Sequence, residues 1–187
     1  MPGRMNRAAA KTLILGGVRS GKSRQAAELA GRTGQAVTLI ATATAPDEEL
    51  ASRIEAHRRN RPPQWAVVEE PVHLASALRA AAAPGRVIIV DCLTLWLTNL
   101  LVLENEDALR HECASLLEAL PQLCADCILV SNEVGFGIIP ANPLARRFGD
   151  ETGILHQRLA SLCDRVLLMV AGLPLELKSA TPGVAAS

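Results

Sequence analysis

The sequence predicts an α/β domain with a largely parallel β-sheet and helices on both of its faces. Short apolar segments rich in β-branched residues alternate with helical patterns along the chain. A phosphate-binding motif joins the first predicted strand to the first helix, and 49% of the 187 residues are hydrophobic. This length favours a single domain, at 12–178, between a disordered lead at 1–11 and a disordered small-residue tail at 179–187.

The first strand, loop and helix together predict a phosphate cradle. Residues 12–15 suggest a buried strand and 24–32 a helix. The loop between them fits the pattern of glycine, four residues, glycine, lysine and serine: Gly16, Gly17, Val18, Arg19, Ser20, Gly21, Lys22 and Ser23. Backbone N–H groups and the helix N-terminus would bind phosphate oxygens. We expect a purine nucleoside triphosphate, with Lys22 at the β- and γ-phosphates and Ser23 on Mg²⁺, and the alternative is an ordinary glycine-rich turn.

The next segment predicts a strand at 35–41, a loop to Pro46 and a helix at 47–59. The acidic residues of this helix come first and its basic residues last, which suits the helix dipole. The segment Arg61-Pro62-Pro63 ends the helix.

The middle of the chain continues the alternation. It predicts strands at 65–70 and 87–91, helices at 71–81 and 93–103, and a further helix that ends near 120–121. The 87–91 segment is continuously apolar up to its final aspartate, as expected for a strand buried on both faces.

The last third predicts a strand at 127–131, a glycine- and proline-rich loop at 132–143, a helix at 144–161 and a strand at 165–171. Ligands of open α/β sheets collect at the carboxyl ends of the strands. We therefore expect the loops after Leu15, Ala41, Val90 and Ser131 to meet at one edge.

Composition excludes several functional classes. The 19 basic and 19 acidic residues cancel, so neither a nucleic acid nor a membrane surface is expected as the main partner. The absence of tyrosine, with two tryptophans and two phenylalanines, argues against base-stacking platforms. Polar residues interrupt the longest apolar run, which makes it a poor membrane span. Five cysteines without a preceding secretory signal favour a reducing cytoplasm.

Two residues outside the loop are candidates for chemistry. Asp91 ends an apolar strand, where it could hold Mg²⁺ beside Ser23 or simply cap the next helix. His57 shares the apolar face of its helix with Leu50 and Ile54, so a core or interface histidine is the alternative to a nucleophile. Neighbouring arginines would lower its pKa, keep the imidazole neutral and neutralise a triphosphate, or would form a solvated face: Arg53, Arg58, Arg59 and Arg61.

The 132–137 loop supplies a further carboxylate. Glu133 could be the general base for a substrate hydroxyl or a partner of the Mg²⁺ shell. A structural hydrogen bond within the loop is the alternative. The Cys124 and Cys127 pair stands alone, which makes a zinc site a weak hypothesis.

Several of these segments together resemble one family. It is the bifunctional adenosylcobinamide kinase and adenosylcobinamide-phosphate guanylyltransferase family of cobalamin synthesis, and the likeness runs from about Thr12 to Pro174. The segments are the loop with its internal Arg19-Ser20, Arg53-Ile54-x-x-His57, Arg61-Pro62, Trp65, Asn132-Glu133-Val134-Gly135-x-Gly137-Ile138-x-Pro140 and Leu144-Ala145-Arg146.

The resemblance implies two reactions at one nucleotide site. ATP or GTP phosphorylates adenosylcobinamide, and GTP then guanylylates a histidine that passes GMP to the phosphorylated corrinoid. His57 matches that histidine, Lys22 would act with it in catalysis, and Ser23 and Asp91 would hold Mg²⁺. Nucleotide contacts would come from the 16–23 loop and from Ala41, Thr42, Ala43, Arg58, Arg59, Asn60, Arg61, Glu69 and Asp91.

The resemblance also implies a RecA-like three-layer sandwich and a homotrimer, for which the apolar 93–103 helix is a candidate interface. At His156-Gln157 the sequence departs from the Asn-Gln that relatives often carry, and no role is assigned there.

Two other functions remain open at this point. A GTP-binding switch or GTPase needs no nucleophilic histidine after its second strand, so His57 disfavours it. A kinase of another small alcohol is disfavoured by the 132–140 loop.

Overall fold

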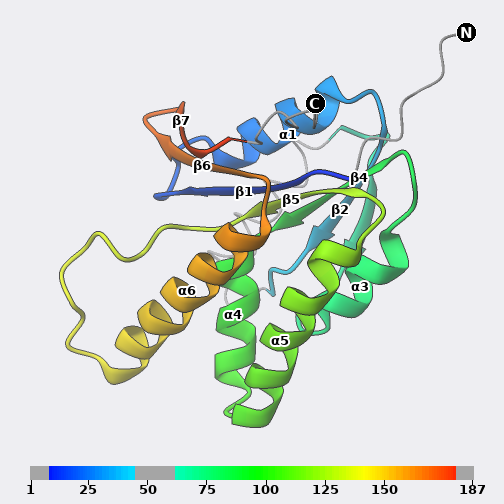
Figure 1. Cartoon of the computed structure of the whole chain (residues 1–187). Coiled ribbons are helices and arrows are strands. Elements are labelled where there is room, and N and C mark those ends of the chain that lie inside the picture. Colours follow the sequence, from blue (N-terminus) through cyan, green and yellow to red (C-terminus); the bar gives the residue numbers. More distant parts are fainter. Residues whose placement is uncertain (1–8, 45–61, 180–187) are drawn as a thin grey trace, which may run out of the picture.

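The computed structural model describes residues 9–44 and 62–179 (Figure 1). The predicted helix at 47–59 lies outside the described residues. So do most of the predicted N-terminal lead and, from residue 180, the C-terminal tail.

A seven-stranded sheet forms the centre of the described part of the chain, in the order β3-β2-β4-β5-β1-β6-β7. Neighbouring strands pair in parallel throughout, except that β7 runs antiparallel to β6. The largely parallel sheet predicted from the sequence is therefore confirmed. The strands are β1 (Lys11–Gly16), β2 (Ala36–Ala41), β3 (Ala66–Glu69), β4 (Arg86–Asp91), β5 (Asp126–Val130), β6 (Arg165–Val170) and β7 (Leu173–Lys178).

Helices cover both faces of this sheet (Figure 1). One face carries α1 (Lys22–Arg32), which packs Ala26 and Ala30 against Ile14 and Ile89. The other face carries α3 (Leu74–Ala81), α4 (Leu93–Val102), α5 (Glu106–Gln122) and α6 (Pro143–Leu162). The strands between the two layers have apolar side chains on both faces, which explains the continuous run of buried residues in β4.

The α4 helix lies at the centre of the larger core. Trp96, Leu97 and Leu100 are almost fully buried, and the Trp96 indole N–H donates to the backbone oxygen of Val72 at 2.7 Å. Each such buried side chain contributes roughly 1.5–3 kcal/mol to folding. Most apolar side chains of 93–103, the segment that the sequence suggested for an oligomer interface, lie in the core of the chain itself, whereas Val102 and Leu103 are exposed.

The strand register brings the functional loops to one edge. Ala41, Asp91 and Val130 are aligned across β2, β4 and β5, and Val130 is aligned with Ile14 of β1. The loops that follow these strands therefore begin at nearly the same level. The register therefore brings the four loops to the carboxyl edge of the sheet, as the sequence predicted.

The β7 strand was not predicted from the sequence. It forms a hairpin with β6 through Ala171 (φ 51°) and Gly172 (φ 81°), which are the two positive φ values that a tight two-residue turn requires. All six residues of β7 are exposed. A proline at its second position and an Ala-Gly turn gave little local signal for a hairpin.

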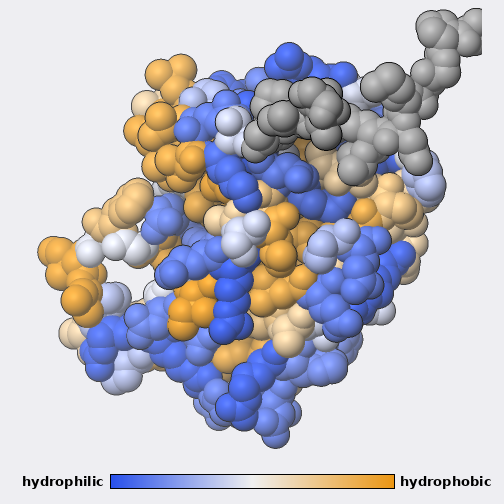
Figure 2. Space-filling model, in the orientation of Figure 1, coloured by the Kyte–Doolittle hydropathy of each residue, from blue (hydrophilic) through white to orange (hydrophobic). Residues whose placement is uncertain are grey.

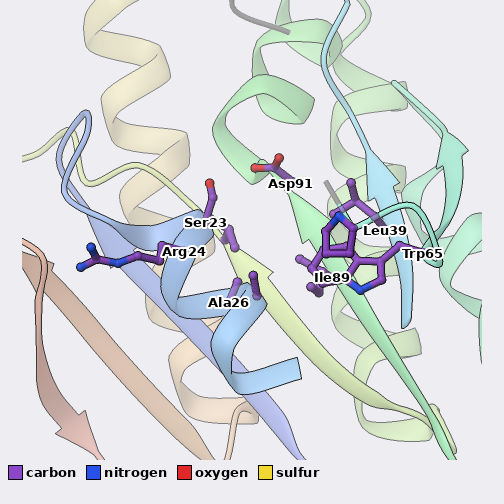
Figure 3. A pocket seen from close by; sticks show the side chains of 10 residues that line it. Ser23, Arg24, Ala26, Leu39, Trp65, Ile89 and Asp91 are labelled. Carbon is purple, nitrogen blue, oxygen red and sulfur yellow. The ribbon is translucent and has the colours of Figure 1, made fainter. Parts of the chain in front are cut away.

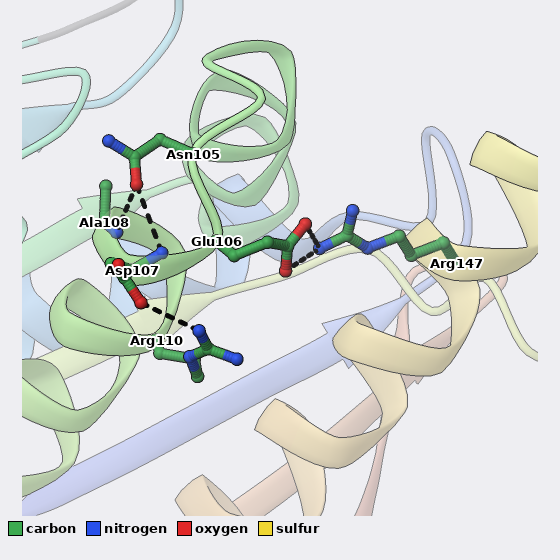
Figure 4. Close-up of polar contacts among 6 residues, drawn as sticks. All are labelled: Asn105, Glu106, Asp107, Ala108, Arg110 and Arg147. Atoms are coloured by element: carbon green, nitrogen blue, oxygen red, sulfur yellow. Dashed lines mark hydrogen bonds and ion pairs between the residues drawn. The ribbon is translucent and has the colours of Figure 1, made fainter.

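Polar contacts fix the starts of α5 and α6 relative to each other (Figure 4). The Asn105 side-chain oxygen accepts hydrogen bonds from the N–H groups of Asp107 and Ala108, at 3.1 and 3.0 Å, and so caps α5. Next to this cap, Arg147 of α6 forms an ion pair with Glu106 of α5 at 2.6 Å. The loop before α6 is thereby anchored at its far end.

A histidine–glutamate pair joins α3 to α5. His73 Nδ1 lies 2.8 Å from Glu112 Oε1, with the imidazole largely exposed and the carboxylate almost buried. The hydrogen bond to Glu112, followed by its charge, raises the pKa of His73 above its usual value.

This pair predicts a pH-dependent contribution to stability. Because the folded-state pKa of His73 exceeds its unfolded value, the contribution is fully present below about pH 6.5 and is lost as pH rises through the folded pKa. We expect the free energy of unfolding of the wild type, minus that of His73→Gln, to fall between pH 5.5 and 9 in urea titrations. His111→Gln controls for the loss of an exposed imidazole. A difference that grows with pH would contradict this assignment.

Candidate active site

The phosphate-binding loop connects β1 to α1 through backbone conformations that favour glycine. Gly21 has φ 97° and Gly16 has φ 152°, while Arg19 also has a positive φ of 55°. A Cβ at Gly16 would lie 2.6 Å from both the Met169 carbonyl oxygen and Ser20 Oγ. The loop is therefore pressed against the end of β6, with no room for a side chain at its first residue.

Backbone hydrogen bonds hold the loop from both neighbouring strands. The Glu133 N–H, just after β5, donates to the Gly16 oxygen at 2.9 Å. The Gly172 N–H, in the β6–β7 turn, donates to the Ser20 oxygen at 3.1 Å. These bonds fix the curvature of the loop before any ligand binds, which reduces the ordering cost of binding.

Lys22 is buried at the first turn of α1. It is 8% exposed, and its Nζ donates to the Gly17 carbonyl oxygen at 2.6 Å, folding the side chain back over the loop. Burial lowers the pKa of Lys22, while Cys92 and Asp91 oppose that shift. An anion within the loop would restore the electrostatic stabilisation that this ammonium group lost with its hydration.

The interior of the loop has unused capacity for hydrogen bonding. Ser20 Oγ is buried and has no hydrogen-bond partner in the described structure. Unsatisfied buried hydroxyls are uncommon in native proteins, because each costs about 1–3 kcal/mol. Phosphate oxygens would satisfy this hydroxyl, so the donor groups of the loop fit a phosphate ligand.

A cavity of about 360 Å³ lies beside the loop (Figure 3). The Ser23 hydroxyl and the Asp91 carboxylate lie at one end of it, while Leu39, Ile89 and Trp65 form an apolar wall. Its other lining residues are Arg24, Ala26, Ala27, Pro62 and Val130. The hydroxyl and the carboxylate that were predicted to share a Mg²⁺ ion therefore do face one space.

The nucleotide contacts predicted near the end of β2 differ in how far they are buried. Thr42 is fully buried, and its hydroxyl both donates to the Cys92 oxygen at 2.8 Å and accepts from the Cys92 N–H at 2.9 Å. Its side chain is thus engaged in joining β2 to β4. Ala41 is also buried, whereas Ala43 is partly exposed. Glu69 lies at the end of β3, in register with Ala41.

The structure leaves several predicted site residues undescribed. His57, Arg58, Arg59, Asn60 and Arg61 lie outside the described residues, so their positions relative to the loop stay predictions. Among the described residues, no three His, Cys, Asp or Glu side chains gather as a metal site, and Cys124 and Cys127 are free thiols. None of the described helices combines the length and hydrophobicity needed to cross a bilayer.

Comparison with known proteins now identifies the family. Residues 12–177 match the family model described as cobinamide kinase / cobinamide phosphate guanyltransferase. The bifunctional adenosylcobalamin biosynthesis protein CobP of Pseudomonas aeruginosa is 53% identical over 168 residues, which cover 90% of this chain and 97% of that protein. CobU of Escherichia coli is 40% identical, over 89% of this chain and 98% of the relative.

The chain belongs to the cobinamide kinase / cobinamide phosphate guanyltransferase family. CobU of Salmonella typhimurium supports the same assignment, with 41% identity over 89% of this chain. The predicted family and its paired activities are confirmed, and both activities use nucleotides as substrates. Cobinamide and cobinamide phosphate are the other substrates that the family description names.

The fold of this family member also has a distant structural relative. The RadB recombinase aligns with a TM-score of 0.51 at 19% identity, over 85% of this chain and 73% of that one. This likeness concerns the fold alone, and it confirms the predicted RecA-like architecture.

The structure also reveals residues that the sequence did not link to the site. Ser131 and His156 are both buried and lie together beneath the 132–142 loop, although 25 residues separate them in the chain. The position of Ser131 directly after a buried strand could have indicated that it lies at the carboxyl edge of the sheet. The sequence marked His156 only as a departure from the residue that relatives often carry, and it assigned no role to it.

The crowding at Gly16 yields a direct test of the phosphate site. Gly16→Ala should abolish the rise in melting temperature that GTP produces, because the added Cβ must displace Ser20 or the end of β6. It should also cost roughly 1–3 kcal/mol of stability through overpacking. Differential scanning fluorimetry with and without GTP measures both. Gly149→Ala, in α6 where a Cβ meets nothing within 4 Å, is the matched control and should keep the GTP response. Wild-type GTP binding by Gly16→Ala would refute the assignment.

Proposed function

We propose that this chain phosphorylates adenosylcobinamide with ATP or GTP and then transfers GMP from GTP to the product, using one phosphate cradle for both steps. The observation that carries the proposal is the prearranged 16–23 loop, with its buried Lys22 and unsatisfied Ser20 hydroxyl. The loop and Lys22 bind the triphosphate. Asp91 and Glu69 belong to the same nucleotide site, together with 41–43 and 58–61.

The proposal includes Mg²⁺ as the metal of this site. Ser23 and Asp91 offer a hydroxyl and a carboxylate oxygen at one end of the cavity, which are donors that Mg²⁺ prefers. Two protein ligands suit this ion, which takes its other ligands from phosphates and water. When bound, Mg²⁺ would neutralise charge that develops on the phosphate oxygens. Lys22 adds positive charge from the protein side of the same phosphates.

The first proposed step is phosphoryl transfer. The corrinoid hydroxyl oxygen forms a bond to the γ-phosphorus, and the bond from that phosphorus to the β–γ bridging oxygen breaks. The nucleoside diphosphate leaves, and the hydroxyl proton passes to a base. Lys22, at the β- and γ-phosphates, would stabilise the charge on the transferred and leaving groups.

The second proposed step is guanylyl transfer in two displacements. An imidazole nitrogen of His57 attacks the α-phosphorus of GTP and pyrophosphate leaves. A phosphate oxygen of adenosylcobinamide phosphate then attacks the same phosphorus and releases His57. Adenosylcobinamide-GDP is the product. A phosphoramidate intermediate divides one difficult transfer into two easier ones.

The His57 intermediate can be trapped directly. Incubation of the full chain with GTP labelled at the α-phosphate should leave a covalent GMP adduct that is stable to alkali and labile to acid. His57→Ala should lose this adduct, and EDTA should suppress it in the wild type. His111→Ala, which removes an exposed histidine of α5, should label as the wild type does. An adduct that persists in His57→Ala would overturn the assignment.

A homotrimer completes the proposal. The edge strand β7 exposes Leu173, Leu175 and Leu177, which alternate along it and so share one of its faces. Figure 2 shows an apolar surface over β6 and β7. A self-association surface of this kind would cover an otherwise exposed apolar edge. Sedimentation equilibrium should give three times the chain mass, and Leu175→Glu should lower it.

A further inference from the structure

Glu133 joins the 132–142 loop to the phosphate cradle. Its N–H donates to the carbonyl oxygen of Gly16, the first residue of the phosphate-binding loop. Its Oε1 accepts from the Gly135 N–H at 2.6 Å, which holds the carboxylate over the base of its own loop. The Glu133 side chain is 18% exposed. A carboxylate is therefore fixed beside the triphosphate site while still open to a substrate.

A buried histidine lies behind this carboxylate. His156 of α6 is 7% exposed, and its Nδ1 lies 4.0 Å from Glu133 Oε2, about 1 Å longer than a hydrogen bond. Its Nε2 lies 2.7 Å from Ser131 Oγ. Burial lowers the pKa of His156, and the charge of Glu133 opposes that shift. A neutral imidazole has one N–H and one acceptor nitrogen to share between these two neighbours.

The chemistry of the neighbours decides the tautomer. The Glu133 carboxylate can only accept a hydrogen bond, so its charge, 4.0 Å from Nδ1, favours the N–H on that nitrogen. The Ser131 hydroxyl then donates to Nε2. Ser131 is completely buried, so no substrate reaches its hydroxyl and the cluster cannot act as a serine nucleophile with its base. Within this cluster, Ser131 therefore orients His156, and His156 faces Glu133.

We propose that Glu133 is the general base for the corrinoid hydroxyl in the kinase step, and that His156, oriented by Ser131, positions the Glu133 carboxylate. This inference rests on the proposed function and assigns a base to the first of its two reactions. Glu133 removes the proton of the hydroxyl as the oxygen bonds to the γ-phosphorus. The protonated Glu133 returns that proton to solvent after the nucleoside diphosphate departs.

The two reactions need this base to different extents. An alkyl hydroxyl is a weak nucleophile until its proton is removed, and a positioned base typically contributes about 10²–10⁴-fold. The nucleophiles of guanylyl transfer are a neutral imidazole and a phosphate monoester, which is largely ionised at neutral pH. Neither needs a carboxylate to remove a proton. Loss of Glu133 should therefore separate the two activities.

The experiment measures the two half-reactions separately in the full chain. The first is phosphorylation of adenosylcobinamide by γ-labelled nucleotide. The second is pyrophosphate release from GTP in the presence of adenosylcobinamide phosphate. Glu133→Gln keeps an oxygen for the Gly135 N–H and removes only the charge. It should lower kcat of the kinase step about 10²–10⁴-fold and leave guanylyl transfer within about twofold of the wild type.

Variants at His156 test positioning. His156→Leu removes both nitrogens and should lower kcat of the kinase step at least tenfold without changing KM for adenosylcobinamide. His156→Asn retains an N–H donor and an acceptor and should recover most of that loss. Guanylyl transfer by each variant reports whether the chain has folded. Glu118→Gln, which removes an exposed charge on α5, is the matched control and should affect neither half-reaction.

Three results would overturn the inference. Full kinase activity in Glu133→Gln would show that Glu133 is not the base. Equal losses of both half-reactions in Glu133→Gln would show that the carboxylate only supports the loop. A His156→Asn that is as impaired as His156→Leu would refute the positioning role. A wild-type chain inactive in both half-reactions would instead overturn the proposed function, and the inference with it.

Discussion

The close approach of the phosphate-binding loop to the strands beside it is the constraint on which the rest of the site depends. Gly16 accepts a hydrogen bond from Glu133, and no Cβ can fit at this position between Met169 and Ser20. On the opposite side, the Gly172 N–H donates to Ser20. A loop fixed in this way keeps its curvature without a ligand. Because β1 lies between β5 and β6, both supports come from the same parallel sheet.

Several charged or polar groups near this loop carry a desolvation cost. Lys22 is buried with a lowered pKa, Ser20 Oγ has no partner in the described structure, and His156 is buried against a carboxylate. Of these groups, the unsatisfied Ser20 hydroxyl destabilises the ligand-free chain by about 1–3 kcal/mol. The apolar packing around Trp96 and the helices beneath the sheet offsets that cost. Binding of a polyphosphate returns part of it as affinity, which is how local instability becomes function.

A shared phosphate cradle can serve two reactions because their nucleophiles need different assistance. A hydroxyl needs a base beside the γ-phosphorus, and in the proposed mechanism this base is Glu133, whose N–H donates to the Gly16 oxygen. An imidazole or a phosphate needs only positioning at the α-phosphorus. The cradle supplies what the reactions have in common, which is charge stabilisation on phosphate oxygens. The segments around the cradle would then determine which of the two reactions takes place.

The sequence alone determined the phosphate-binding loop, the alternation of strands and helices, and the position of Asp91 at a strand end. These features depend on residues close together in the chain, where spacing and periodicity carry the signal. The tertiary structure decided what depends on distant segments. It added β7, whose turn gives little local sequence signal, and it placed most of the apolar residues of 93–103 in the core. It engaged the Thr42 hydroxyl with Cys92, and it brought His156 to Ser131 and Glu133. No local pattern encodes these contacts, because they arise only when the strands pair and α6 packs against their carboxyl ends.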